Sequence, residues 1–146
     1  MSVAVVSRED AGQPALPMPF RPPAAPAVMA LLAQAGRGLA EARRDQGPAE
    51  RFTGAYLSAL RAAAAVLAAK GRPHRGRSKP ASVWVLLESA APELKEWALY
   101  FASNSATQAA VQAGITGRLT SVMADDLLRQ SEQFVELARR VVHGGD

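Results

Sequence analysis

The feature that most constrains the fold is an alanine-rich run over residues 48–70 whose larger apolar side chains recur at helical spacing. They follow one another in steps of four, four, three and four: Phe52, Tyr56, Leu60, Ala63 and Leu67. Such steps place side chains on one face of an α-helix, so the run predicts a long helix with one continuous apolar face. Burying that face requires neighbouring elements, and we expect this helix at the centre of the molecule.

Four further segments carry helix signals. We expect helices over 26–45, 82–89, 92–113 and from the cap Thr120 to about 141. Pro26 and Pro92 can each occupy a first helical position, where the missing N–H costs nothing, and Gly114 is a suitable C-cap. The β-branched and aromatic start of "SVWVLLES" (82–89) also fits a strand. The preceding Pro80 and the helix-forming Leu-Leu-Glu favour a short buried helix.

The composition agrees with a helical fold, because 49% of the chain is hydrophobic but only 5% is aromatic. Alanine has the highest helix propensity, which favours closely packed helices over a sandwich or barrel. The sequence therefore predicts an all-α protein, an antiparallel helical bundle of four to five helices. Residues 1–25 contain five prolines and few large apolar residues. They are predicted to form a disordered tail before a single domain over 26–143.

Several function classes are excluded or disfavoured by what the chain lacks. It contains no cysteine, which excludes disulfides, thiol catalysis and thiolate metal sites. The apolar run 3–6 is followed at once by charged residues, and the later run 62–69 is too short to span about 30 Å of hydrocarbon. We expect a soluble cytoplasmic protein without membrane contact.

Positive charge is concentrated in one segment. The net charge is +4, yet residues 70–80 hold five cations and no acid, so the rest of the chain carries −1. The five cations are Lys70, Arg72, Arg75, Arg77 and Lys79. They are candidate contacts for phosphates of RNA or single-stranded DNA, or for an acidic protein. The segment has no aromatic residue for base stacking and Trp84 is expected in the core, so any binding is expected to be weak and sequence-tolerant. A solvated connector is the alternative.

Three stretches carry a family resemblance. They are "YLSALRAAAAVLAAKGRP" (56–73), "SVWVLLESAAPELKEWALYFAS" (82–103) and "AGITGRLTSVMADDLLRQSEQFVELAR" (113–139). In order and spacing they resemble a family of small stand-alone HEPN-domain proteins typical of actinobacteria. The resemblance implies an antiparallel helical bundle that often forms homodimers. It also implies a superfamily associated with RNA binding, metal-independent RNA cleavage, toxin systems and nucleotide-related regulation.

The resemblance allows the sequence to be checked for the catalytic residues of HEPN proteins. Catalytic HEPN proteins carry an Arg and a His separated by four to six residues, which can stabilise phosphate charge and manage the 2′-hydroxyl proton. For His143 that arginine would lie at 136–138, and for His74 at 67–69, and neither range contains one. Arg139 is nearest to His143, with three residues between them. The pair Arg139 and His143 is therefore an off-pattern candidate only.

Other catalytic chemistries have no support in the sequence. Asp125 and Asp126 are adjacent, so on a helix they point about 100° apart and cannot pair as a dyad. No Glu-x-x-His, His-Glu-x-x-His, phosphate-binding loop or Gly-x-Ser-x-Gly motif is present. We expect neither a metal nor a cofactor.

These observations lead to one expectation and two alternatives. The expectation is a non-catalytic HEPN-like module that binds RNA, single-stranded nucleic acid or an acidic protein, in stress or toxin-type regulation. The first alternative is a metal-independent endoribonuclease that uses Arg139 and His143. The second alternative is a structural protein that dimerises or acts as an adaptor.

Overall fold

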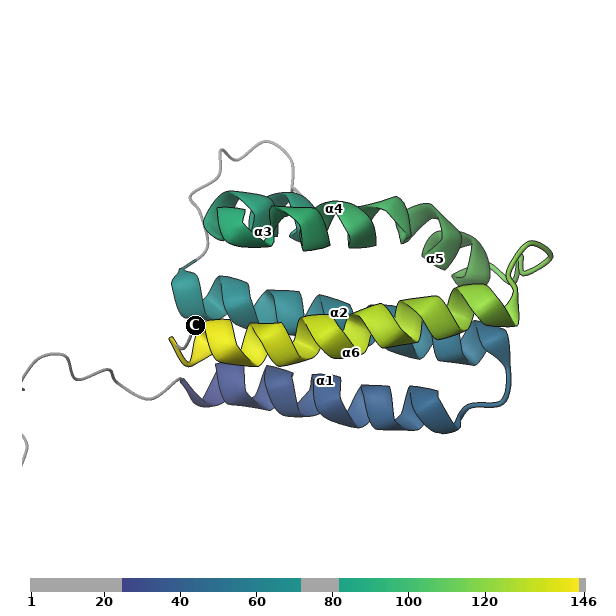
Figure 1. Ribbon diagram of the computed structural model, residues 1–146, viewed down its shortest axis with the longest axis horizontal. Helices are drawn as coiled ribbons and strands as arrows, with labels where there is room; N and C mark the ends of the chain where they lie inside the picture. Colours follow the sequence, from purple (N-terminus) through teal and green to yellow (C-terminus); the bar gives the residue numbers. More distant parts are fainter. Residues whose placement is uncertain (1–24, 72–81, 145–146) are drawn as a thin grey trace, which may run out of the picture.

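The computed structural model describes residues 25–71 and 82–144, and all regular structure in these ranges is helical (Figure 1). The elements are α1 (Pro26–Arg44), α2 (Pro48–Lys70), α3 (Val83–Ala90), the 3₁₀ turn η1 (Pro92–Leu94), α4 (Lys95–Ser103), α5 (Ser105–Gln112) and α6 (Ser121–Val142). The prediction of an all-α bundle is confirmed. The predicted tail, apart from Ala25, lies outside the described residues.

The predicted starts of the helices have the expected local causes. Proline occupies the first turn of α1, α2 and η1. The Ser82 hydroxyl accepts a hydrogen bond from the Val85 N–H at 3.2 Å and caps α3. The Thr120 hydroxyl accepts one from the Met123 N–H at 3.1 Å and caps α6. "SVWVLLES" therefore begins a helix, as predicted, because its cap satisfies a backbone donor that would otherwise be unpaired.

Consecutive segments run in opposite directions (Figure 1). α1 lies antiparallel to α2, and the row formed by α3, α4 and α5 runs back along the other side of α2 and α6. α2 packs against α1, α3, α5 and α6, so it is the central helix that its apolar face predicted. Six of its buried residues have small side chains, which permit this close packing: Ala55, Ser58, Ala59, Ala62, Ala63 and Ala65.

The interface between α1 and α2 is close enough to require glycine. A Cβ added at Gly54 of α2 would lie 3.1 Å from the Ala42 Cβ of α1. A Cβ added at Gly38 of α1 would lie 2.4 Å from the Ser58 hydroxyl of α2. Glycine lowers helix propensity by about 1 kcal/mol relative to alanine. Here that cost accompanies a close approach of the two backbones.

Aromatic side chains hold the α3–α5 row against the long helices. The ring of Trp84 stacks on Phe101 with centroids 5.0 Å apart, and Phe101 meets Phe134 of α6 at 5.2 Å. The Trp84 indole N–H also donates to the Tyr56 hydroxyl of α2 at 2.9 Å. Trp84 is 4% exposed, which confirms its expected place in the core.

The segment 92–113 is not the single helix that was predicted. It contains the 3₁₀ turn η1, then α4, then α5, with a break at Asn104. The Ser103 hydroxyl and the Asn104 amide both donate to the Tyr100 carbonyl, at 2.6 and 3.0 Å. The Ser105 hydroxyl donates to the Ala102 carbonyl at 2.7 Å. Such side-chain bonds compete with the helical hydrogen bonds, so three consecutive polar residues bend the segment.

Among the described residues, α2 is the one helix long and apolar enough to cross a membrane on length and composition alone. More than half of its most apolar window, 56%, is buried inside the bundle. The core helix of a globular protein meets the same criterion when its apolar face is covered by neighbouring helices.

Candidate nucleic-acid interface

Of the five cations predicted to form a binding segment, the described residues include only Lys70, the last residue of α2. Its ammonium lies 3.3 Å from a Glu93 carboxylate oxygen, and the two side chains are 36% and 55% exposed. The pKa of Glu93 is lowered mainly by a hydrogen bond from its own backbone N–H; desolvation opposes this shift, and Lys70 lowers the pKa further. The other four, Arg72, Arg75, Arg77 and Lys79, lie outside the described residues, as does His74.

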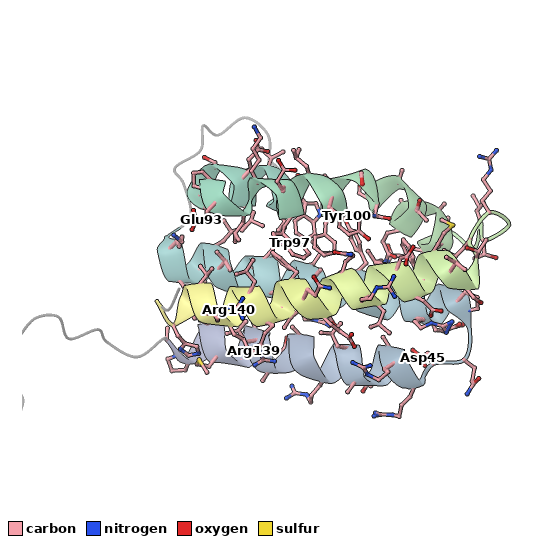
Figure 2. All side chains as sticks on the ribbon, viewed as in Figure 1. Asp45, Glu93, Trp97, Tyr100, Arg139 and Arg140 are labelled. Atoms are coloured by element: carbon pink, nitrogen blue, oxygen red, sulfur yellow. The ribbon has the colours of Figure 1, made fainter. Side chains whose placement is uncertain are left out.

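The candidate catalytic pair lies near the C-terminus of α6. Arg139 extends its side chain toward α1, as Figure 2 shows: its guanidinium Nε is 3.8 Å from the Glu136 carboxylate, and a Cβ on Gly36 would lie 2.9 Å from its Nη2. His143 is the exposed C-cap residue, one turn further along the chain. Its backbone N–H donates to the Arg139 carbonyl at 3.1 Å, and no side-chain hydrogen bond joins the pair within the described part of the chain.

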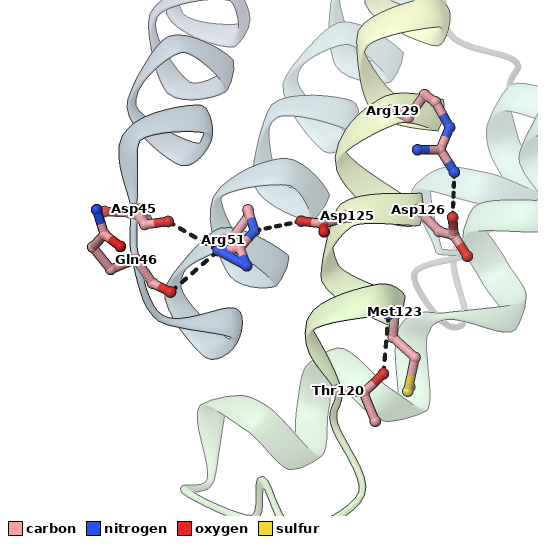
Figure 3. Close-up of polar contacts among 8 residues, drawn as sticks. All are labelled: Asp45, Gln46, Arg51, Thr120, Met123, Asp125, Asp126 and Arg129. Carbon is pink, nitrogen blue, oxygen red and sulfur yellow. Dashed lines mark hydrogen bonds and ion pairs between the residues drawn. The ribbon is translucent and has the colours of Figure 1, made fainter.

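The adjacent carboxylates of α6 point in different directions, as their spacing predicted (Figure 3). Asp125 accepts a hydrogen bond from the Arg51 Nε at 2.9 Å, and Asp126 pairs with Arg129 on its own helix. Arg51 also donates from Nη1 to the carbonyls of Asp45 and Gln46, at 2.9 and 3.3 Å. Arg51 and Asp125 therefore join the turn between α1 and α2 to the start of α6.

A polar groove lies between α4 and α6, and sequence reasoning missed it. Its volume is about 550 Å³, and its walls are Trp97, Arg129, Glu132, Gln133, Glu136, Leu137 and Arg140. Arg140 lines this groove together with Trp97 of α4, whereas Arg139 extends toward α1 (Figure 2). Arg129, Gln133, Glu136 and Arg140 follow one another in steps of four, three and four. That spacing indicates a polar face on α6, but it does not indicate that this face lies beside a tryptophan.

The charges of the groove are partly neutralised from outside it. Glu132 pairs with Arg43 of α1, and Glu136 pairs with Arg139. Arg140 forms no ion pair with any residue in 25–71 or 82–144. The groove residues together with their paired partners therefore carry a net positive charge.

An apolar groove lies at the opposite end of the bundle, between α5, the following loop and the start of α6. Its volume is about 520 Å³, and it is lined mostly by apolar side chains together with Arg118. Ile115 and Met123 line it, and the neighbouring Val122 is 68% exposed. Within the described residues, no cluster of three or more His, Asp or Glu side chains could hold a metal ion.

The chain matches a known protein family. The family model of the SAV_6107-like HEPN domain, which is named after a Streptomyces protein, matches residues 42–139, more than half of the chain. The match extends from the end of α1 to the C-terminal part of α6 and includes both the basic segment and most of the polar groove. No curated protein and no solved structure matches the chain.

Proposed function

Because the chain belongs to the SAV_6107-like HEPN family, we propose that it is a non-catalytic helical module that binds RNA or another single-stranded nucleic acid through the basic segment 70–79. The observation that carries the proposal is the uneven charge. The described residues hold eleven Lys and Arg against ten Asp and Glu, so they are nearly neutral. The segment 72–79 adds four cations and no acid. Nearly all of the net charge therefore comes from a stretch of eight residues.

The position of the segment in the chain supports this proposal. It follows Lys70 at the C-terminus of α2, and α6 ends at the same end of the bundle (Figure 1). Arg139 and Arg140 lie in the last turn of α6 and add positive charge there. Cations contact phosphates without reading bases, so tolerance of sequence is expected.

The surroundings of Arg139 support a non-catalytic module over a ribonuclease. Its guanidinium lies against α1 and near Glu136, while His143 is exposed at the C-cap one turn away. A general base and a phosphate-binding cation would have to approach one scissile phosphate together. Within the described residues, the Arg139 side chain is held near Gly36 and Glu136, and no hydrogen bond joins it to the side chain of His143.

Salt-dependent binding tests the proposal. We expect the protein to change the fluorescence anisotropy of a labelled 12-nucleotide RNA, with log affinity falling against log salt at a slope of about −3.5 if all five cations meet phosphates. The double variant Arg75→Ala/Arg77→Ala should reduce the slope by about 1.4. The matched control Arg37→Ala/Arg44→Ala removes two exposed arginines of α1 and should leave the slope nearly unchanged. A slope near zero, or no binding at low salt, would refute nucleic-acid binding.

The ribonuclease alternative has a separate test. Labelled RNA incubated with the protein in EDTA should stay intact. Cleavage that is lost in the His143→Ala variant would replace the non-catalytic proposal with the Arg139 and His143 enzyme. Cleavage that the variant retains would point to a contaminating nuclease and would leave the proposal standing.

Two partner predictions are also proposals. An acidic protein is the alternative ligand of segment 70–79, and poly-glutamate that competes with the RNA would favour it. Homodimerisation is favoured by the uncovered apolar groove that Ile115 and Met123 line. Light scattering over a range of protein concentrations measures the molar mass, and a monomer at every concentration would contradict the dimer.

A further inference from the structure

We propose that the polar groove between α4 and α6 binds a short stretch of single-stranded nucleic acid, with one base stacked on Trp97 and flanking phosphates on Arg129 and Arg140. The inference rests on the proposed function and gives it a base-contacting site separate from segment 70–79. The groove residues come from α4 and α6 alone, and all of them lie within the described part of the chain.

Trp97 is a fixed aromatic surface beside the groove. Its ring packs on Phe101 with centroids 6.3 Å apart and nearly parallel planes, at 21°, and lies 5.7 Å from Phe134. Phe101 and Phe134 are fully buried, so they hold the tryptophan in place, while Trp97 itself is only partly buried and lines the groove. Stacking on a ring that is already ordered loses little side-chain entropy, and a base–aromatic stack contributes substantially to single-strand binding.

The facing side of α6 has cations at both ends and hydrogen-bond acceptors between them. Arg129 and Arg140 are eleven residues apart, close to three full turns, so they lie on one face and about 16 Å apart along the axis. Glu132, Gln133 and Glu136 lie between them. Carboxylates and amide oxygens accept hydrogen bonds from the exocyclic amino groups of bases, and arginines bind phosphates. The order of charges thus suits a base at the centre and phosphates at the two ends.

The acidic residues of the groove do not make it repel an anion. Glu132 is paired with Arg43 of α1. Glu136 is paired with Arg139, which extends toward α1. Arg129 is positioned by Asp126 on its own helix. The carboxylate charges are balanced from outside the groove, and the cation at the Arg140 end faces it.

The same order of charges disfavours a second copy of the chain in this groove. If two α6 helices docked antiparallel about the centre of the groove, Arg129 of each would lie opposite Arg140 of the other. Like charges placed opposite one another at an interface weaken it. A nucleic-acid strand, with negative charge at intervals and bases between, meets no such repulsion.

Tryptophan fluorescence tests the site directly. The chain has two tryptophans, and Trp84 is 4% exposed, so quenching by an added base reports on Trp97. We expect an unlabelled 12-nucleotide RNA, added to the full chain with excitation at 295 nm, to quench the wild-type emission. The Trp97→Phe variant keeps an aromatic ring for folding, and it should lose the quenching while its affinity falls less than about threefold.

Affinity measurements on arginine variants give the second readout. Arg140→Gln should weaken binding of the labelled RNA about tenfold, because it removes a charge-assisted hydrogen bond to phosphate, and should reduce the salt slope by about 0.7. The matched control is Arg37→Gln, which removes one exposed arginine of α1 outside the groove. It should change affinity less than twofold.

The outcomes separate this inference from the function on which it rests. Salt-dependent binding without quenching, and with equal effects of Arg140→Gln and Arg37→Gln, would overturn the proposal that the groove binds nucleic acid. Segment 70–79 would then remain the binding site. If the RNA does not bind at low salt, both the groove site and the proposed function are overturned. A change in molar mass caused by Arg140→Gln in light scattering, in either direction, would show that the groove is a protein interface, which also overturns the inference.

Discussion

One buried hydrogen bond joins α2 to α3, from the Trp84 indole N–H to the Tyr56 hydroxyl at 2.9 Å. Both residues are at most 5% exposed, so water cannot replace either partner. We expect Tyr56→Phe to lower the free energy of unfolding by about 1–3 kcal/mol, because the indole N–H is left unsatisfied in the core. Urea denaturation followed by circular dichroism measures the loss. The half-buried Tyr100→Phe is the control, and an equal loss there would contradict this reason.

The ionisation of Tyr100 depends on the carboxylate beside it. Burial raises the pKa of its phenol above the ordinary value of 10.0, and the charge of Asp126 raises it further. Above pH 10 the unfolded chain therefore releases this proton more readily than the folded chain does. The stability that Tyr100 contributes is present below pH 10 and is lost as the pH rises through the raised pKa of the folded state.

A substitution separates the two causes of that shift. Asp126→Asn should lower the pKa of Tyr100, because it removes the repelling charge and leaves burial as the cause that raises this pKa, against the lowering effects of Asn104 and Arg129. Absorbance at 295 nm, recorded against pH and compared with Tyr100→Phe, gives the midpoint of the phenol. Asp125→Asn is the matched control, since Asp125 points toward Arg51 and is not among the groups that perturb Tyr100. A midpoint that moves equally in both variants would exclude Asp126 as the specific cause.

At the scale of elements, the start of α6 depends on one hydroxyl. Thr120 accepts a hydrogen bond from the Met123 N–H at 3.1 Å, and both lie at the exposed end of the helix. We expect Thr120→Ala to lower the free energy of unfolding by about 1 kcal/mol, the usual effect of losing an N-cap. Thr120→Ser keeps the hydroxyl and should restore most of the loss in the same denaturation experiment. A serine variant as unstable as the alanine variant would mean that the cap is not the cause.

The elements also show what local sequence predicts well and where it fails. Capping residues and first-turn prolines act within four residues of a helix start, so Pro26 and Thr120 located two starts correctly. The break at Asn104 depends on which side chains turn back onto the Tyr100 carbonyl rather than outward to water. Spacing alone cannot distinguish those two conformations, and the segment therefore looked like one helix.

At the scale of the whole molecule, the polar groove could not be predicted because its two walls are far apart in the chain. Trp97 belongs to α4, whereas Arg129 and Arg140 belong to α6. Only the packing of α4 beside α6 makes them neighbours. The basic segment, in contrast, follows from composition alone, because five cations without an acid need no fold to be recognised.

The folded domain begins before the region that the family model matches. The family match begins at residue 42, yet α1 lies almost entirely before it. α1 nevertheless buries Val28, Leu32 and Leu39 in the common core, where it packs against α2 and α6. Burial of each such side chain contributes about 1.5–3 kcal/mol, so α1 supplies a large part of the 5–15 kcal/mol that is typical of a domain.

Two shortened chains test this boundary. A chain that begins at residue 25 keeps all of α1, and we expect its free energy of unfolding to stay within about 0.5 kcal/mol of the full chain. A chain that begins at residue 46 loses the cover over α2 and α6, and it should lose its cooperative urea transition because the exposed core can no longer offset the entropy of folding. If the first deletion were as damaging as the second, residues 1–24 would have to contribute to the core, and the domain would not begin at α1.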